Sequence, residues 1–195
     1  MSYHLYINIM IKKLFFLETW TLAFTEEYKD IKSLINYKWQ VIKPDFFDYF
    51  ADPSILSINT EAKTVEIVCE SINFLSGKGY IKKLTYSFKD KKIINSDTLI
   101  KNKFHLSFPN KFHFDGDEIL LYENQEQNYL GVLNLNNLNI ENNQIVAGKY
   151  LDPIVIKVKD DNLLIYSYRS NHNIEFGIKH IGEGFELKET DVKYI

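Results

Sequence analysis

The chain has 195 residues, of which 45% are hydrophobic, 25% charged and 15% aromatic, and its formal net charge is −3. This composition indicates a folded, soluble protein and argues against a disordered chain. The lack of a basic excess argues against a nucleic-acid partner. The single cysteine, Cys69, excludes an intrachain disulfide and lies in an apolar run. We therefore expect a buried thiol in a cytoplasmic protein.

The N-terminal segment, residues 1–50, differs in pattern from the rest of the chain. Residues 5–17 are rich in apolar side chains, but Lys12-Lys13 interrupt them and no small-residue cleavage site follows. This pattern fits neither a signal peptide nor a membrane span, which needs about 20 apolar residues. Strands are predicted here at Phe15–Phe24 and Trp39–Ile42. A short helix or a long loop is predicted between them at Glu26–Ile35.

Three units of one design follow, and each carries a proline near its start. Pro53, Pro109 and Pro153 are 56 and 44 residues apart. A proline at the start of a strand loses no ladder hydrogen bond if its position lies outside the paired region. Repeats of roughly 40–50 residues made of strands are typical of β-propeller blades. The predicted units are residues 51–106, 107–150 and 151–195 within a single domain.

Each unit is predicted to contain four strands, with a tight turn between the first and second. The Asp-Gly and Asp-Asp turns suit hairpins, and the second strands are nearly continuous apolar runs. The predicted strands are 51–58, 64–71, 79–88 and 93–100; 107–114, 118–124, 129–134 and 142–147; and 151–158, 162–169, 174–180 and 186–192. The class is therefore all-β, with three four-stranded blades. Because propellers usually have four to eight blades, exposed blade faces predict self-association.

Several short motifs occur in the order found in a known family. They are Phe50-Ala51-Asp52-Pro53, His105-Leu106-Ser107-Phe108-Pro109, Tyr122-Glu123 and Leu151-Asp152-Pro153, preceded by Trp20-Thr21-Leu22. Over residues 18–170 the chain resembles the propeller-like domain at the N-terminus of plant glucosamine inositolphosphorylceramide transferases. Bacterial relatives of that domain occur alone or beside sugar formyltransferase domains. The resemblance implies an incomplete five-bladed, glycosidase-like propeller associated with glycoconjugate or surface-polysaccharide synthesis. Ser54 departs from the family, which favours an aromatic residue there.

Carboxylates recur at equivalent positions of the units. Asp52 matches Asp152, and Glu70 matches Glu123, where the third unit has Ser167. Because innermost strands line a propeller channel, we expect these side chains to converge. Two carboxylates about 5–5.5 Å or about 6.5–9.5 Å apart can hydrolyse a glycosidic bond. In such a site Asp52 would be the base and Glu123 the acid, and Asp152 would tune the pKa of the acid. This pattern is similar to that of the five-bladed arabinanase and fructosidase propellers. Alternatively, each carboxylate only caps a turn or accepts backbone N–H bonds.

Other side chains are candidate ligand-binding groups. His105 precedes the second unit, and Tyr166 and Arg169 end the second strand of the third, where aromatic and cationic groups suit sugars or anions. Together with Glu70 they form the predicted binding set; packing roles are the alternative. Gly77-Lys78-Gly79 lacks a following helix, so we expect no phosphate loop and no cofactor. No metal site is expected, because the remaining candidate histidines lack ligand spacing: His113, His172 and His180.

Three functions remain open from the sequence. The first is a non-catalytic or accessory carbohydrate-binding domain in surface-polysaccharide or glycoconjugate biosynthesis. The second is a glycoside hydrolase or glycosyl-transfer enzyme that uses Asp52, Glu123 and Asp152. The third is a protein-interaction scaffold or a truncated fragment without a ligand. An aromatic-lined cleft without paired acids favours the first, an open cavity between acids favours the second, and a plugged apolar surface favours the third.

Overall fold

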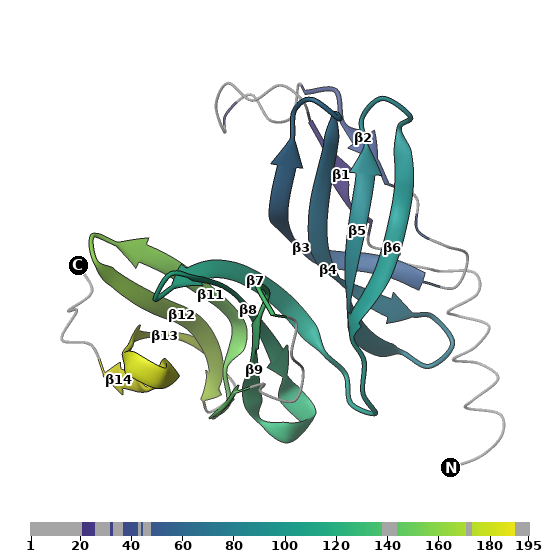
Figure 1. Cartoon of the computed structure of the whole chain (residues 1–195). Helices are drawn as coiled ribbons and strands as arrows, with labels where there is room; N and C mark the ends of the chain where they lie inside the picture. Colours follow the sequence, from purple (N-terminus) through teal and green to yellow (C-terminus); the bar gives the residue numbers. More distant parts are fainter. Residues whose placement is uncertain are drawn as a thin grey trace, which may run out of the picture.

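The structure is a computed structural model, and it is all-β in the part of the chain that it describes (Figure 1). The described residues contain strands and short 3₁₀ turns but no α-helix, as the sequence predicted. No helix in this part is long and apolar enough to cross a membrane. The structure describes residues 21–25, 32, 37–42, 44, 48–137, 144–170 and 173–189.

Three four-stranded antiparallel sheets follow one another along the chain, each with its strands paired in chain order. The first sheet contains β3 (Asp48–Asn59), β4 (Thr64–Asn73), β5 (Lys78–Ser87) and β6 (Lys92–Ile100). The second contains β7 (Ser107–Phe114), β8 (Asp117–Asn124), β9 (Tyr129–Asn134) and β10 (Gln144–Ala147). The third contains β11 (Leu151–Val158), β12 (Asp161–Ser170), β13 (Asn173–Ile181) and β14 (Leu187–Glu189). All twelve predicted strands are present, with ends shifted by a few residues.

A small two-stranded sheet precedes them. It pairs β1 (Ala23–Phe24) with β2 (Gln40–Val41) in antiparallel fashion. Both strands fall within the predicted N-terminal strands and are shorter than predicted. The helix or loop predicted for Glu26–Ile35 lies outside the described residues except for residue 32. Further predicted strand residues also lie outside them: 15–20, 142–143 and 190–192.

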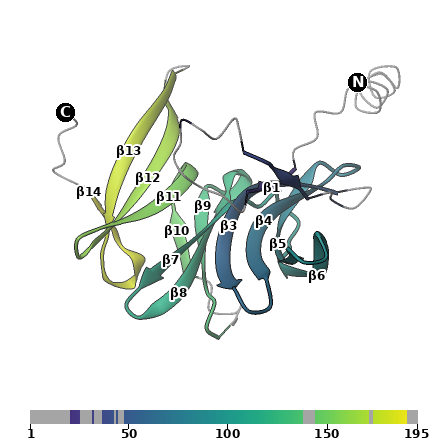
Figure 2. The same cartoon turned by 90° about the horizontal axis from the view of Figure 1, so that it is seen from above.

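The sheets stack face to face, and each interface is an apolar cluster. Leu22 and Ile42 beside β1 and β2 pack against the first sheet. At the next interface, Val68 and Ile81 of the first sheet pack against the second sheet. At the last interface, Leu121 and Leu130 of the second sheet pack against Val155 and Leu164 of the third sheet. Burying each such side chain stabilises the fold by roughly 1.5–3 kcal/mol. The first strands β3, β7 and β11 lie innermost, with β7 contacting both of the others (Figure 2).

One backbone irregularity is repeated in all three sheets. The residues before the three prolines, Asp52, Phe108 and Asp152, have φ values of 48°, 51° and 49°. In each case this residue and its proline lie opposite a single residue of the second strand, which defines a β-bulge. Aspartate tolerates this left-handed conformation better than most residues, and it occupies the position in two of the three sheets.

The bulge corrects the sequence interpretation of the prolines. In the first sheet Ala51 pairs with Glu70 before Pro53 is reached, so Pro53 lies inside the paired region. A bulge leaves one residue without a ladder partner, and a proline there loses no hydrogen bond. The spacing of the prolines located the repeated strands correctly, but the prediction that they lie outside the pairing was wrong.

A side-chain hydrogen bond also recurs between neighbouring sheets. The amide of Lys111 in β7 donates to Oγ of Ser54 in β3 at 3.1 Å. The amide of Val155 in β11 donates to Oδ1 of Asn110 in β7 at 3.0 Å. Ser54 and Asn110 both follow the repeated proline directly. The third sheet has Ile154 at that position, with 43% of its surface exposed.

The outer face of the third sheet is uncovered in the described part of the chain. Phe176 of β13 faces outward and is 70% exposed, whereas Ile81 and Leu130 at the equivalent pairing positions of the other sheets are 0% exposed. Further apolar side chains on this face are exposed: Ile154, Ile156, Val158 and Ile174. We call this surface the outer apolar face.

Candidate functional site

Carboxylates from all three sheets lie near one another on the first and second strands of the sheets. Glu70 lies opposite Ala51, Glu123 lies opposite Ser107, and Ser167 lies opposite Leu151, so the three positions are structurally equivalent. The four acidic side chains that meet here form the carboxylate cluster: Asp52, Glu70, Glu123 and Asp152. Electrostatic interactions connect carboxylates of different sheets within the cluster.

Glu123 is the most enclosed member of the carboxylate cluster, with 1% of its surface exposed. Its Oε2 accepts the amide N–H of Asp152 at 3.3 Å, and Oε1 is buried without a well-aligned hydrogen bond from a described residue. Burial raises the pKa of Glu123 to about 7, and the charges of Asp152 and Glu70 act in the same direction, although Gln125 and the Asp152 amide oppose them. A carboxyl in this setting holds its proton near neutral pH.

Asp52 is half-buried beside Glu70 in the bulge of the first sheet. Burial raises the pKa of Asp52 to about 7, and a hydrogen bond shared with Glu70 and the charges of Glu70 and Asp152 add to the effect. Two carboxyls that share a proton cannot both ionise easily. The raised pKa of Asp52 favours its protonated form, which can donate a hydrogen bond to Glu70.

Asp152 has a different setting, because it is exposed at the bulge of the third sheet. The hydroxyl of Ser167 donates to Oδ2 of Asp152 and to the carbonyl of Leu151, both at 3.3 Å. The predicted catalytic trio thus consists of one exposed carboxylate, Asp152, one half-buried one, Asp52, and one enclosed one, Glu123. One oxygen of Glu123 accepts a backbone N–H and one oxygen of Asp152 accepts a hydroxyl, so both carboxylates make hydrogen bonds within the protein.

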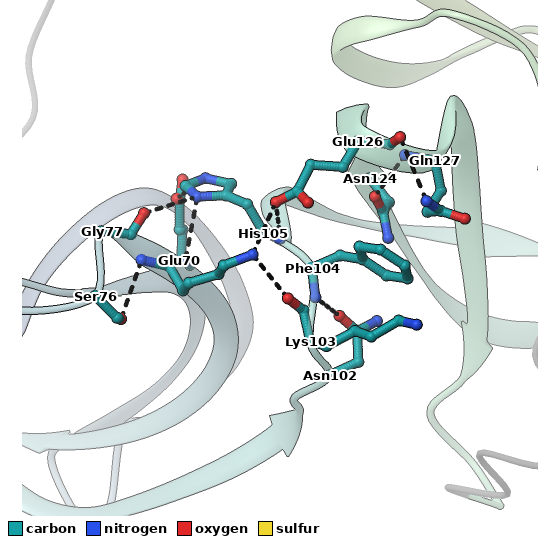
Figure 3. A network of polar contacts seen from close by, with 12 residues as sticks. Glu70, Ser76, Gly77, Asn102, Lys103, Phe104, His105, Asn124, Glu126 and Gln127 are labelled. Atoms are coloured by element: carbon teal, nitrogen blue, oxygen red, sulfur yellow. Dashed lines mark hydrogen bonds and ion pairs between the residues drawn. The ribbon is translucent and has the colours of Figure 1, made fainter. Parts of the chain in front are cut away.

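His105 lies against the carboxylate cluster from the connection between the first two sheets (Figure 3). Its Nε2 lies 2.8 Å from Oε1 of Glu70. Nδ1 lies 3.1 Å from the amide N of Gly79, which can donate to it when the ring is neutral, and 3.3 Å from the carbonyl O of Gly77, which can accept from it when the ring is protonated. The bond to Glu70 is the largest of several effects that raise the pKa of His105. Both ring nitrogens therefore have protein partners.

A polar network around His105 joins the first sheet to the second (Figure 3). Nζ of Lys78, at the start of β5, donates to the carbonyl of Lys103 at 2.8 Å and to Oε1 of Glu126 at 3.2 Å. Glu126, in the 3₁₀ turn η2 (Gln125–Gln127), also accepts the backbone N–H of His105 at 3.0 Å. These bonds position His105 over Glu70.

A pocket of about 570 Å³ opens beside the carboxylate cluster, between the second and third sheets. We call it the inter-sheet pocket. Two pairs of consecutive residues connect it to the cluster, because Asn124 follows Glu123 and Leu151 precedes Asp152. The described residues that line it are Asn124, Gln125, Asn128, Gly148, Lys149, Tyr150, Leu151, Tyr166, Tyr168, Arg169 and Lys179.

Three tyrosines form the aromatic wall of the inter-sheet pocket. The rings of Tyr150 and Tyr166 meet edge to face with centroids 4.8 Å apart, and the ring of Tyr168 lies 6.0 Å from that of Tyr166. Gly177 lies opposite Tyr166 in the neighbouring strand, and a Cβ there would lie 2.4 Å from Cζ of Tyr166. The ring of Tyr166 therefore lies flat over a glycine, which fixes its position.

The structure separates the predicted binding set into two places. Tyr166 and Arg169 line the inter-sheet pocket, whereas Glu70 and His105 pair with each other at the carboxylate cluster. Sequence reasoning missed Tyr150 and the remaining polar lining residues. Tyr150 had a signal, because it occupies the position before the third repeat that Phe50 occupies before the first. The other missed polar lining residues carried no such signal: Asn124, Gln125, Asn128, Lys149 and Lys179.

The structure also places the remaining candidate metal and thiol groups. No group of three or more His, Cys, Asp or Glu side chains in the described ranges is arranged to hold a metal ion. His113 and His180 lie apart, on β7 and β13, and His172 lies outside the described residues. Cys69 is fully buried in the first sheet, as predicted, and burial raises the pKa of its thiol to about 12. A thiol in this setting is not a nucleophile at neutral pH.

Comparisons with known proteins do not assign the chain to a family. No protein-family model matches the chain. A search of curated proteins finds no significant match.

Proposed function

We propose that this protein is a non-catalytic carbohydrate-binding domain that acts as an accessory in glycoconjugate or surface-polysaccharide biosynthesis. The observation that carries the proposal is the inter-sheet pocket, with its wall of Tyr150, Tyr166 and Tyr168 beside the exposed side chain of Gln125. Sugars are bound by apolar contacts of their ring faces with aromatic rings and by hydrogen bonds of their hydroxyls. This pocket offers both kinds of group.

The size of the inter-sheet pocket supports the same proposal. Its volume of about 570 Å³ lies within the range of roughly 300–1,000 Å³ that is typical of small-molecule sites. The tyrosine rings are held by one another and by Gly177, so the aromatic wall exists before a ligand arrives. A preformed site loses less conformational entropy on binding.

The proposal includes a propeller-type arrangement of the sheets. Each sheet is a four-stranded antiparallel meander, the sheets stack face to face, and β3, β7 and β11 lie innermost. Propeller blades have this design. The proposed relationship is to the five-bladed, glycosidase-like propeller of the glucosamine inositolphosphorylceramide transferases, and the repeated Asp-Pro motifs at Asp52-Pro53 and Asp152-Pro153 support it.

A glycoside hydrolase or glycosyl-transfer enzyme is the second candidate. It is favoured by the carboxyls of Asp52 and Glu123, whose pKa values burial raises to about 7, because a general acid works best near the ambient pH. In that mechanism Asp52 is the base, Glu123 the acid and Asp152 the tuning group. Glu123 is only 1% exposed and bonded to the backbone of Asp152, so the binding function has the stronger support.

Titration of the full chain with a panel of mono- and disaccharides, followed by isothermal calorimetry, tests the first proposal. We expect Tyr166→Ala to weaken saccharide binding at least tenfold, because stacking on an aromatic ring is lost. Phe176→Ala is the matched control, since Phe176 is an exposed ring of the same sheet outside the inter-sheet pocket. Absence of saccharide binding by the wild-type protein would contradict the proposal.

The same panel separates the two candidates. Turnover of any glycoside that disappears in Asp52→Asn, while circular dichroism shows an intact fold, would favour the enzyme. Binding without turnover in both proteins supports the accessory domain. Unfolding of Asp52→Asn would identify Asp52 as a structural group of the bulge.

We also propose that the protein forms a homo-oligomer through the outer apolar face. This face carries Phe176, whose equivalents Ile81 and Leu130 are covered by the next sheet. A second copy that presents the same face would bury these side chains in a symmetric interface.

A further inference from the structure

The charge of the inter-sheet pocket differs from that of the whole chain. The chain carries 23 Lys and Arg against 26 Asp and Glu residues, which gives a net charge of −3. Among the described residues, the lining nevertheless includes Lys149, Arg169 and Lys179 and no acidic residue. Three cations therefore converge on one cavity of an acidic protein, and they come from separate segments: the loop before β11, the end of β12, and β13.

Two of these cations are not engaged by the protein itself. Within the described residues, Lys149 and Arg169 form no ion pair or side-chain hydrogen bond, and both are exposed. The acidic side chains of the carboxylate cluster that are closest in sequence to the lining make hydrogen bonds elsewhere. Asp152 accepts a hydrogen bond from the hydroxyl of Ser167, and Glu123 accepts one from the amide of Asp152. No described residue therefore compensates the charges of Lys149 and Arg169 through an ion pair.

We infer that the inter-sheet pocket binds an anionic sugar, a saccharide that carries a carboxylate or a phosphate. This inference rests on the proposed carbohydrate-binding function and names the class of its ligand. The tyrosine wall contacts the sugar ring. Arg169 is opposite Ile174 at the end of β12, so it lies at the rim of the inter-sheet pocket and not among the tyrosines, and its guanidinium attracts the anionic group from there. The ammonium of Lys149 at the mouth of the inter-sheet pocket adds a charge-assisted bond. An uronic acid and a sugar phosphate share this chemistry.

The test is isothermal calorimetry of the full-length protein at low and at physiological salt. The probes are glucose, glucuronate, glucose 1-phosphate, the matching galactose series and inorganic phosphate alone. We expect at least one charged sugar of a series to bind at least tenfold more tightly than its neutral parent, with the preference falling as salt rises. Comparison of the uronate with the phosphate identifies the source of the charge.

Arg169→Gln provides the matched variant, because it keeps the planar end and removes the charge. It is expected to abolish the preference for charged sugars, and Lys149→Gln is expected to reduce it. The control Lys157→Gln removes an exposed lysine of β11 outside the inter-sheet pocket and should change nothing. Thermal unfolding by circular dichroism verifies that each variant is folded.

The outcomes distinguish this inference from the proposed function. If neutral and charged sugars bind equally well, the ligand class is wrong and the carbohydrate-binding function stands. If inorganic phosphate binds as tightly as glucose 1-phosphate, the sugar contributes nothing and the inference is overturned. If no saccharide binds at all, the proposed function fails together with the inference.

Discussion

The imidazole of His105 covers the carboxylate of Glu70, with Nε2 2.8 Å from Oε1. Glu70 is 3% exposed, so this contact supplies a cationic or hydrogen-bonding partner to a carboxylate that water scarcely reaches. Gly79 makes the contact close, because a Cβ there would lie 2.6 Å from Oε1 of Glu70 and 3.0 Å from Nε2 of His105. The pair belongs to the framework that holds the first two sheets together.

His105→Ala should destabilise the protein by about 1–3 kcal/mol, because it leaves a buried acceptor without its donor. The bond to Glu70 raises the pKa of folded His105. Because the pKa of His105 is higher in the folded protein than in the unfolded chain, protonation of His105 stabilises the fold. This stabilisation is complete below the pKa of the unfolded chain, about 6.5, and is lost as the pH rises through the pKa of the folded protein. Urea unfolding should therefore show a larger loss for His105→Ala at pH 5.5 than at pH 9.

The control for this prediction is His113→Ala. The side chain of His113 is 69% exposed and its Nε2 lies 3.9 Å from Oε1 of Glu118. Its removal should change the free energy of unfolding little at either pH. An equal loss for His105→Ala at both pH values would contradict a charged His105–Glu70 pair.

Glu123→Gln should stabilise the protein at alkaline pH. Burial raises the pKa of Glu123 from 4.5 to about 7, so the wild type loses stability as the pH rises from about 4.5 through 7. The difference between the proteins should approach the order of 3 kcal/mol at pH 8 and vanish near pH 4. Chemical unfolding across this range measures it, and Glu61→Gln, on the exposed β3–β4 turn, is the control. Parallel pH profiles for wild type and Glu123→Gln would refute the burial argument.

The strands were predictable because their signals are local. Alternating apolar side chains and turn residues such as Asp115-Gly116 occur within each strand pair, so all twelve predicted strands are found. The bulge was not predictable, because a sequence motif such as Asp52-Pro53 does not reveal the sign of φ. A proline outside the pairing and a proline in a bulge both avoid a lost hydrogen bond.

The site was predictable only in part, because packing between sheets determines it. Asp52, Glu70, Glu123 and Asp152 were predicted to lie near one another because they occupy matching positions in the repeated units, and each of these positions can be read from the sequence of its own unit. The pairing of His105 with Glu70 depends instead on how the connection between two sheets folds back. The inter-sheet pocket likewise needs segments distant in sequence, and no local pattern indicates that they meet.

Two glycines provide a matched pair of variants. A Cβ at Gly131 would lie 2.0 Å from Cζ of Tyr122, and one at Gly177 would lie 2.4 Å from Cζ of Tyr166. Both Gly→Ala substitutions force a ring to move and should destabilise the protein by about 1–3 kcal/mol. Only Tyr166 lines the inter-sheet pocket, so only Gly177→Ala should also weaken saccharide binding. Equal loss of binding in both variants would show that the effect is a general loss of fold.

The repeated hydrogen bond between sheets predicts the behaviour of Asn110. Its Oδ1 accepts the amide of Val155 at 3.0 Å, across the interface between the second and third sheets. Asn110→Ala should reduce the free energy of unfolding by about 1–3 kcal/mol, because it leaves a half-buried N–H without a partner. Asn110→Asp retains the acceptor and should recover most of the loss in the same denaturant titration. Failure of Asn110→Asp to differ from Asn110→Ala would exclude this bond as a contributor.

Self-association through the outer apolar face can be tested by single charges. Phe176 is 70% exposed and Ile156 is 38% exposed on this face, whereas Ile81 and Leu130, the equivalents of Phe176 in the other sheets, are 0% exposed. A symmetric pair of these faces would remove both side chains from water, at about 25 cal/mol per Å² of apolar surface. Sedimentation velocity should therefore show a concentration-dependent dimer of the wild type.

Phe176→Lys and Ile156→Lys should each shift that equilibrium to the monomer, because like charges would meet across the symmetry axis. Lys157→Glu, on the opposite face of the same strand as Ile156, is the control and should leave the dimer intact. Saccharide binding should survive in the monomeric variants, because the inter-sheet pocket lies on the other side of the third sheet, against the second. A wild type that remains monomeric at all concentrations would show that a second copy does not cover the outer apolar face.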